Sequence, residues 1–163
     1  MATGTVSSVN YDNWQEIASV TTNSGTSTTT VVSGLAGYKK LLLVWRSIVI
    51  SSSGTLAVRF NSETTNYIGG AWANEYNGTM LNNENKAHVE ATGSTEFKNG
   101  YIYIDNVLSA APKTFQGFGD TQGYVNSIGG AWYNTSAITS ITLVPNSTQT
   151  FTSGTVKLYG IAA

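Results

Sequence analysis

The chain has 163 residues, a mass of 17.3 kDa and a net charge of −1, with no cysteine and a single histidine. Thr, Ser, Asn and Gly account for 73 residues, whereas charged residues make up only 10%, against about 25% in ordinary domains. This composition excludes a disulfide framework, Cys-ligated zinc, His-rich metal sites and the basic surface that nucleic acid requires. The hydrophobic content of 40% is high enough for a packed core, which excludes disorder of the whole chain.

Neither a signal peptide nor a membrane span is expected. The first ten residues contain no basic stretch and no apolar segment of the required length. The longest apolar stretch, residues 41–50, is interrupted by Arg46 and is far shorter than the roughly 20 residues that cross a bilayer. We interpret it as a buried central strand.

Strand-like segments separated by turn residues follow one another along the chain. β-Branched and aromatic residues are common, and the spacing of about 8–12 residues is typical of a β-sandwich. The predicted fold class is therefore all-β: an antiparallel, jelly-roll-like β-sandwich of about ten strands, with an N-terminal arm at 1–12 and one domain at 13–163. Residues 40–50 and 55–61 are expected to form a hairpin across a Ser/Gly turn. The expected strands are 14–20, 27–33, 40–50, 55–61, 67–72, 87–91, 100–107, 113–119, 124–132, 137–144 and 155–161.

Alternation within these strands predicts which side chains form the core. In a strand, every second side chain points to the same face, so one apolar set faces inward. The predicted core residues are Leu42, Val44, Val58, Phe60, Ile102, Ile104, Ile141, Leu143 and Leu158.

One short sequence, IGGAW, occurs at residues 68–72 and again at residues 128–132. One interpretation is a pair of equivalent strand-and-bulge corners, one in each sheet, with tryptophan filling the edge of the core. The other is a pair of aromatic contact sites on one face, for a glycan or a protein partner. The candidate contacts in this second interpretation are Trp72, Tyr76, Trp132 and Tyr133.

No constellation of catalytic residues is apparent, so we expect neither enzymatic activity nor a cofactor. The nearest approach to a glycosidase carboxylate pair is the group Glu75, Glu84, Glu90 and Glu96. Its Asn-rich surroundings indicate a solvated loop instead. His88 is interpreted as a cross-strand hydrogen-bonding partner rather than a metal ligand.

Five segments spread along the chain carry short motifs. They are 14–19 (WQEIAS), 33–43 (SGLAGYKKLLL), 59–61 (RFN), 137–143 (AITSITL) and, after Phe151, 153–161 (SGTVKLYGI). In these motifs the chain resembles a family of tailed-bacteriophage virion proteins. The resemblance implies a jelly-roll sandwich of the kind found in capsid decoration (cement) proteins and in distal modules of tail fibres. The motifs are structural, so the resemblance implies no functional residue.

Two functions follow from the resemblance. The first is a decoration protein on the outer capsid surface of the virion, which stabilises the assembled head by bridging capsid subunits. Its partners would be the major capsid protein and sister protomers, with neither nucleic acid nor membrane. The sister protomers are expected to form a homotrimer, because a closed assembly protects exposed sheet edges. The alternative is a tail-fibre, receptor-binding or carbohydrate-binding module with a glycan partner. We favour decoration, since no coiled-coil or shaft repeat precedes the sandwich.

The arm at 1–12 is the candidate anchor to the capsid. Val6, Val9 and Tyr11 are its only sizeable apolar side chains. They are too few to hold a strand on the chain's own core, but enough to support strand addition to the edge of a neighbour.

Overall fold

The computed structural model describes residues 13–73, 86–89, 97–121, 124–145 and 148–163, apart from the side chains of residues 70, 72, 73 and 124. Over these ranges the chain is an antiparallel β-sandwich of a seven-stranded and a four-stranded sheet, which confirms the predicted fold class. No helix long and apolar enough to cross a membrane occurs in these ranges. The predicted arm at 1–12 lies outside the described residues.

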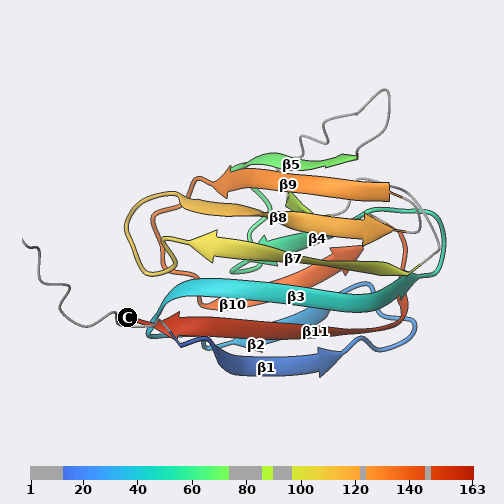
Figure 1. Ribbon diagram of the computed structural model, residues 1–163, viewed down its shortest axis with the longest axis horizontal. Coiled ribbons are helices and arrows are strands. Elements are labelled where there is room, and N and C mark those ends of the chain that lie inside the picture. Colours follow the sequence, from blue (N-terminus) through green and yellow to red (C-terminus); the bar gives the residue numbers. More distant parts are fainter. Residues whose placement is uncertain (1–12, 74–85, 90–96, 122–123, 146–147) are drawn as a thin grey trace, which may run out of the picture.

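Figure 1 looks onto the larger sheet, with the smaller sheet behind it. In spatial order the larger sheet contains β1 (Gln15–Thr21), β11 (Phe151–Ala162), β3 (Tyr38–Ile50), β7 (Lys98–Asp105), β8 (Lys113–Thr121), β9 (Tyr124–Trp132) and β5 (Tyr67–Ala73). The smaller sheet contains β2 (Thr29–Ser33), β10 (Ser140–Pro145), β4 (Leu56–Phe60) and β6 (Ala87–His88). From β1 to β6, successive strands alternate between the two sheets, which is a jelly-roll-like connectivity.

This alternation contradicts the hairpin predicted for residues 40–50 and 55–61. β3 pairs with β11 and β7, whereas β4 pairs with β10 and β6 in the opposite sheet. Residues 51–55 therefore carry the chain across the sandwich rather than around a hairpin turn. The physical reason is that each strand has an apolar face, and two such faces can bury each other by packing across the core.

An aromatic group lies at the centre of the core. The ring of Phe60 in β4 lies 5.6 Å from that of Trp132 in β9 and 6.3 Å from that of Phe115 in β8. Tyr67 stacks on Trp132, and its hydroxyl accepts a 2.8 Å hydrogen bond from the Phe60 amide. Burial raises the pKa of Tyr67 to about 12. These contacts join strands of both sheets, so they fix how the two sheets face each other.

Seven of the nine predicted core residues are buried, but the prediction is wrong for Leu42 and Val44. In β3 the buried side chains are those of Leu41, Leu43 and Trp45. The apolar run there covers both faces of the strand, so alternation alone cannot show which set points inward. Leu42 and Val44 consequently lie half-buried on the outer face of the larger sheet.

The two IGGAW segments pair directly with each other. Gly69 lies opposite Gly130 and Gly70 lies opposite Gly129, in the antiparallel pair of β5 and β9. The interpretation that placed one copy in each sheet is therefore wrong. A Cβ on Gly130 would lie 2.4 Å from the Ile68 carbonyl oxygen and 2.5 Å from the Phe115 ring. The repeated glycine thus lets strand and aromatic core approach closely.

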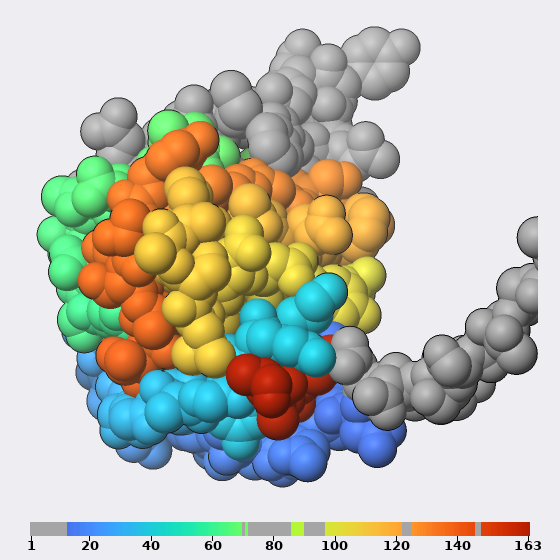
Figure 2. Space-filling view, turned by 90° about the vertical axis from the view of Figure 1, so that its left-hand side faces the viewer, coloured from blue at the N-terminus to red at the C-terminus, as the bar shows by residue number. Residues whose placement is uncertain are grey.

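At one end of the sandwich, polar side chains connect neighbouring loops by hydrogen bonds. Figure 2 shows this end, where the loop around 106–112 and the segment around 133–137 lie side by side. The ammonium group of the buried Lys113 donates to the carbonyl oxygens of Ser109, Ala111 and Asn134 at 2.8, 3.1 and 2.9 Å. It also lies 5.8 Å from the centre of the Trp132 ring. Burial lowers the pKa of Lys113.

Several segments that carry the short sequence motifs meet in this fold. Residues 14–19, 33–43 and 153–161 contribute to β1, β3 and β11, which are adjacent in the order β1-β11-β3. Asn61, the last residue of the RFN motif, is hydrogen-bonded to the motif segment at 137–143. Its Oδ1 accepts hydrogen bonds from the amides of Thr139 at 2.7 Å and Ser140 at 3.1 Å, and its Nδ2 donates to the Ala137 carbonyl oxygen at 2.8 Å.

Candidate binding face

The outer face of the larger sheet carries a row of four aromatic side chains, three of them exposed. Trp14, Tyr103, Tyr101 and Phe118 form this row, which we call the aromatic stripe. Successive ring centres are 5.9, 5.5 and 6.2 Å apart. Phe118 is 51% exposed, Tyr103 40% and Trp14 38%, while Tyr101 is half-buried. An exposed apolar row of this kind marks an interaction surface more often than an isolated aromatic does.

Strand alternation and register produce the stripe. In β7, Ile102 and Ile104 point into the core, which leaves Tyr101 and Tyr103 on the outer face. In β8, Phe118 lies opposite Tyr101 and Gln116 opposite Tyr103. On the other side of β7, the half-buried Val44 and Leu42 lie opposite the same two tyrosines. The outer face is therefore apolar across three neighbouring strands.

Two neighbouring hollows follow the stripe. The first, of about 330 Å³, is lined by Tyr101, Tyr103, Gln116, Phe118 and Ser127 together with residues 117 and 128. The second, of about 360 Å³, shares Tyr103 and Gln116 with the first. It continues to Trp14, Lys40 and Asp105, with residues 41, 104 and 161 as its remaining lining. We call the two hollows together the trough.

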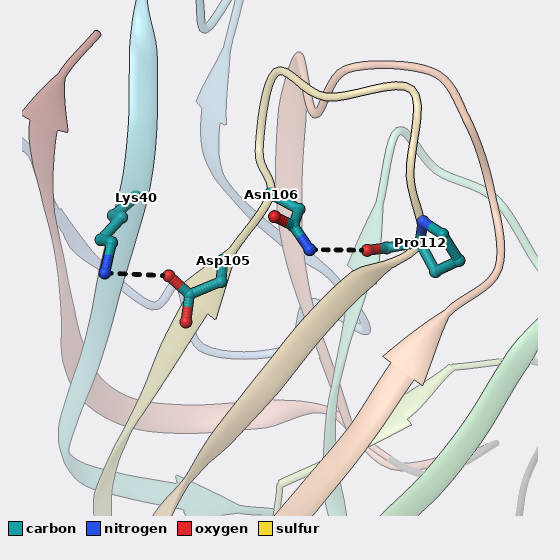
Figure 3. Close-up of polar contacts among 4 residues, drawn as sticks. All are labelled: Lys40, Asp105, Asn106 and Pro112. Atoms are coloured by element: carbon teal, nitrogen blue, oxygen red, sulfur yellow. Dashed lines mark hydrogen bonds and ion pairs between the residues drawn. The ribbon is translucent and has the colours of Figure 1, made fainter.

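The formal charges of the trough lie at one end and neutralise each other. The Lys40 ammonium lies 3.4 Å from the Asp105 carboxylate (Figure 3). Beside this pair, the Asn106 side-chain amide donates a 3.2 Å hydrogen bond to the Pro112 carbonyl oxygen and so shapes the loop after β7 (Figure 3). Gln116 is exposed, and it lines both hollows. The trough therefore offers aromatic surface and neutral hydrogen-bonding groups.

The structure separates the aromatic residues predicted as contacts. Trp132 is fully buried in the core, so it is removed from the candidate contacts. Tyr133 is 55% exposed but lies at a separate, smaller hollow beside residues 66–68. The side chain of Trp72 and all of Tyr76 lie outside the described residues, as do Val6, Val9 and Tyr11 of the arm.

His88 is buried in the smaller sheet. Its Nδ1 lies 3.4 Å from the Thr55 hydroxyl oxygen, and it pairs across strands with Ala57, in keeping with the predicted cross-strand role. Burial, with a smaller contribution from the Lys86 charge, lowers its pKa to about 4. Within the described ranges, no group of three His, Asp or Glu side chains is arranged to hold a metal ion. The predicted carboxylate cluster at 75, 84, 90 and 96 lies outside the described residues.

Sequence reasoning missed every residue of the aromatic stripe as a site residue. A signal was present, because the pattern YIYID in residues 101–105 predicts two tyrosines on the face opposite the buried isoleucines. What the sequence did not contain was the register that brings Phe118 and Trp14 beside those tyrosines. No family model, curated protein or solved structure matches the chain.

Proposed function

We propose that the chain is a bacteriophage capsid decoration protein, which acts by binding and not by catalysis. It binds the outer surface of the assembled head and bridges neighbouring capsid subunits. Because it binds the assembled shell and not the separate subunits, it stabilises the shell by mass action. A homotrimer would present three copies of the bridging contact and protect exposed strand edges.

The observation that carries this proposal is the convergence of the motif segments. β1 and β3 lie in the first third of the sequence and β11 at its end, yet the three are neighbours in one sheet. Asn61 of the RFN motif binds residues 137–140 of the fourth segment. Their convergence supports reading the motifs as features of one fold, and the virion role is what the resemblance implies for that fold.

Head binding and the arm can be tested together. We expect the full chain to sediment with expanded heads stripped of their decoration, and to bind saturably. A variant lacking residues 1–12 should fold with an unchanged circular dichroism spectrum but bind heads more weakly, because strand addition by the arm contributes to attachment. Absence of head binding by the full chain would reject the decoration function. Equal binding by the truncated chain would reject only the anchor.

A second candidate function is that of a receptor-binding or carbohydrate-binding module. The specific observation that favours it is the trough, whose aromatic side chains lie beside neutral hydrogen-bonding groups. The two candidates are compatible, because a domain attached through an arm leaves its sheet face open to solvent.

A further inference from the structure

We propose that the trough binds a neutral oligosaccharide, with the sugar rings lying against the aromatic stripe and their hydroxyl groups bonded to Gln116. This inference rests on the second candidate function and not on capsid attachment. It also moves the glycan site away from the residues suggested by sequence, to a face defined by β7 and β8.

The aromatic stripe supplies the apolar half of the recognition. The ring faces of hexoses carry several C–H groups, which pack favourably against the electron-rich faces of aromatic side chains. The ring centres of Phe118, Tyr101 and Tyr103 are 6.2 and 5.5 Å apart, and neighbouring ring planes are inclined by 59° and 76°. The stripe therefore offers several adjacent aromatic surfaces at different angles, against which successive sugar rings would pack. Phe118 and Tyr103 remain about half exposed, so the sugar would gain contact area that the fold has left open.

The polar groups of the trough indicate a neutral ligand. Gln116 lines both hollows and offers two donors and an acceptor on a planar amide, which can bridge neighbouring sugar hydroxyls. Ser127 adds a hydroxyl at the far side of the first hollow. The charged pair of Lys40 and Asp105 is internally compensated at 3.4 Å, so it neither attracts nor requires a charged ligand. Complementarity of charge therefore favours a polyol over an anion or a nucleic acid.

The shape of the trough indicates a chain of sugars and not a single ring. Each hollow, at about 330 and 360 Å³, lies at the lower end of the sizes usual for small-ligand pockets. Because both are lined by Tyr103 and Gln116, the two hollows are neighbours, and a ligand of several sugar units would contact both. We expect affinity to rise with the number of hexose units until both hollows are filled.

The test uses the full-length protein on a printed array of neutral, sialylated and sulfated oligosaccharides, followed by calorimetry with the tightest neutral binder. We expect binding to neutral oligosaccharides, with affinity falling about tenfold in each of Phe118→Ala and Tyr103→Ala. Gln116→Ala should lower affinity by a smaller factor, of about fivefold. The matched control is Tyr133→Ala, which removes an equally exposed aromatic outside the trough and should leave affinity unchanged.

Several results would overturn the inference. They are an absence of binding to any neutral oligosaccharide, binding confined to acidic glycans, and equal binding by the stripe variants and the wild type. Circular dichroism and urea unfolding identify a variant that has lost its fold, in which case Phe118→Tyr, which keeps the ring, should retain binding where Phe118→Ala does not. If Phe118→Ala weakens binding to expanded heads, the trough is a protein-docking surface and the glycan inference is wrong. Loss of head binding on removal of residues 1–12 bears on the decoration function alone.

Discussion

Asn61 combines an unusual backbone conformation with a dense set of hydrogen bonds. Its φ angle of 53° lies in the left-handed region, which asparagine tolerates better than most residues. From that position its side chain bonds to Ala137, Thr139 and Ser140, and so joins the end of β4 to the segment that leads into β10. The motif residue is thus explained by structure, without a role in binding a ligand.

We predict that Asn61→Ala lowers the free energy of unfolding by about 2 kcal/mol, because it removes these bonds and strains the backbone. Asn61→Asp keeps the acceptor and should lose about half as much. Asn61→Gly relieves the backbone angle but not the lost bonds, so it should remain destabilised in urea unfolding. A glycine variant as stable as the wild type would show that only the backbone angle matters.

The buried His88 predicts a specific dependence of stability on pH. In the unfolded chain a histidine takes up a proton near its ordinary pKa of 6.5, whereas folded His88 stays neutral until about pH 4. Between these values the unfolded state binds more protons, so stability falls as pH is lowered and is regained as pH rises. We expect a loss of about 2 kcal/mol from about pH 7 to about pH 5.

Urea unfolding at a series of pH values would measure this loss. His88 is the single histidine of the chain, so His88→Gln should flatten the dependence in this window whatever its effect on stability at neutral pH. A variant with the same slope as the wild type would show that another group titrates there.

Residue-level prediction from sequence succeeded where the strand has one apolar face and failed where it has two. Ile102 and Ile104 alternate with tyrosines that lie on the outer face, so their burial could be predicted. Leu41, Leu42 and Leu43 offer no such contrast, and the buried set was assigned to the wrong face. The chemistry of these side chains does not determine which set is buried, because that depends on which face of the strand packs against the opposite sheet.

At the level of elements, the close pairing of β5 with β9 depends on glycine. A methyl group on Gly130 would meet both the Ile68 carbonyl oxygen and the Phe115 ring at about 2.4–2.5 Å, well inside contact distance. One of these neighbours is backbone and the other a buried ring, so neither can move without disturbing the sheet or the core.

We therefore predict that Gly130→Ala lowers the free energy of unfolding by roughly 3 kcal/mol. The matched control is Ala131→Ser, which adds one atom at the next position of the same strand and should change stability by less than about 0.5 kcal/mol. Thermal or urea unfolding of the two variants measures the difference. Equal stability of Gly130→Ala and the wild type would mean that the strands separate more easily than the contacts indicate.

Strand positions were predictable from sequence, but strand partners were not. The bounds of β9 agree with the expected segment at both ends, and those of β1 differ by one residue at each end. The pairing of β3 with β7 and β11 could not be inferred, since a Ser/Gly connection serves equally for a hairpin and for a crossing between sheets. For the same reason, the aromatic stripe emerges only once the register of β7 and β8 is known.

At the scale of the whole molecule, the sandwich has one end where side chains connect the loops by hydrogen bonds, and one sheet face with exposed aromatic side chains. Lys113 and Asn61 tie loops together at the end near the start of β8, while the aromatic stripe lies open across the larger sheet. The hydrogen-bonded loops keep the sandwich rigid, and the aromatic stripe is exposed for binding. In the proposed arrangement, the arm and sister protomers attach the domain to the head, and the sheet face remains available to a glycan.

Electron cryomicroscopy of the intact phage particle tests the decoration function most directly. We predict density for three copies of this β-sandwich around a symmetry axis on the outside of the head, in contact with more than one capsid subunit. Density for the domain in the tail, or a head surface that lacks it in particles known to contain the protein, would contradict the proposal.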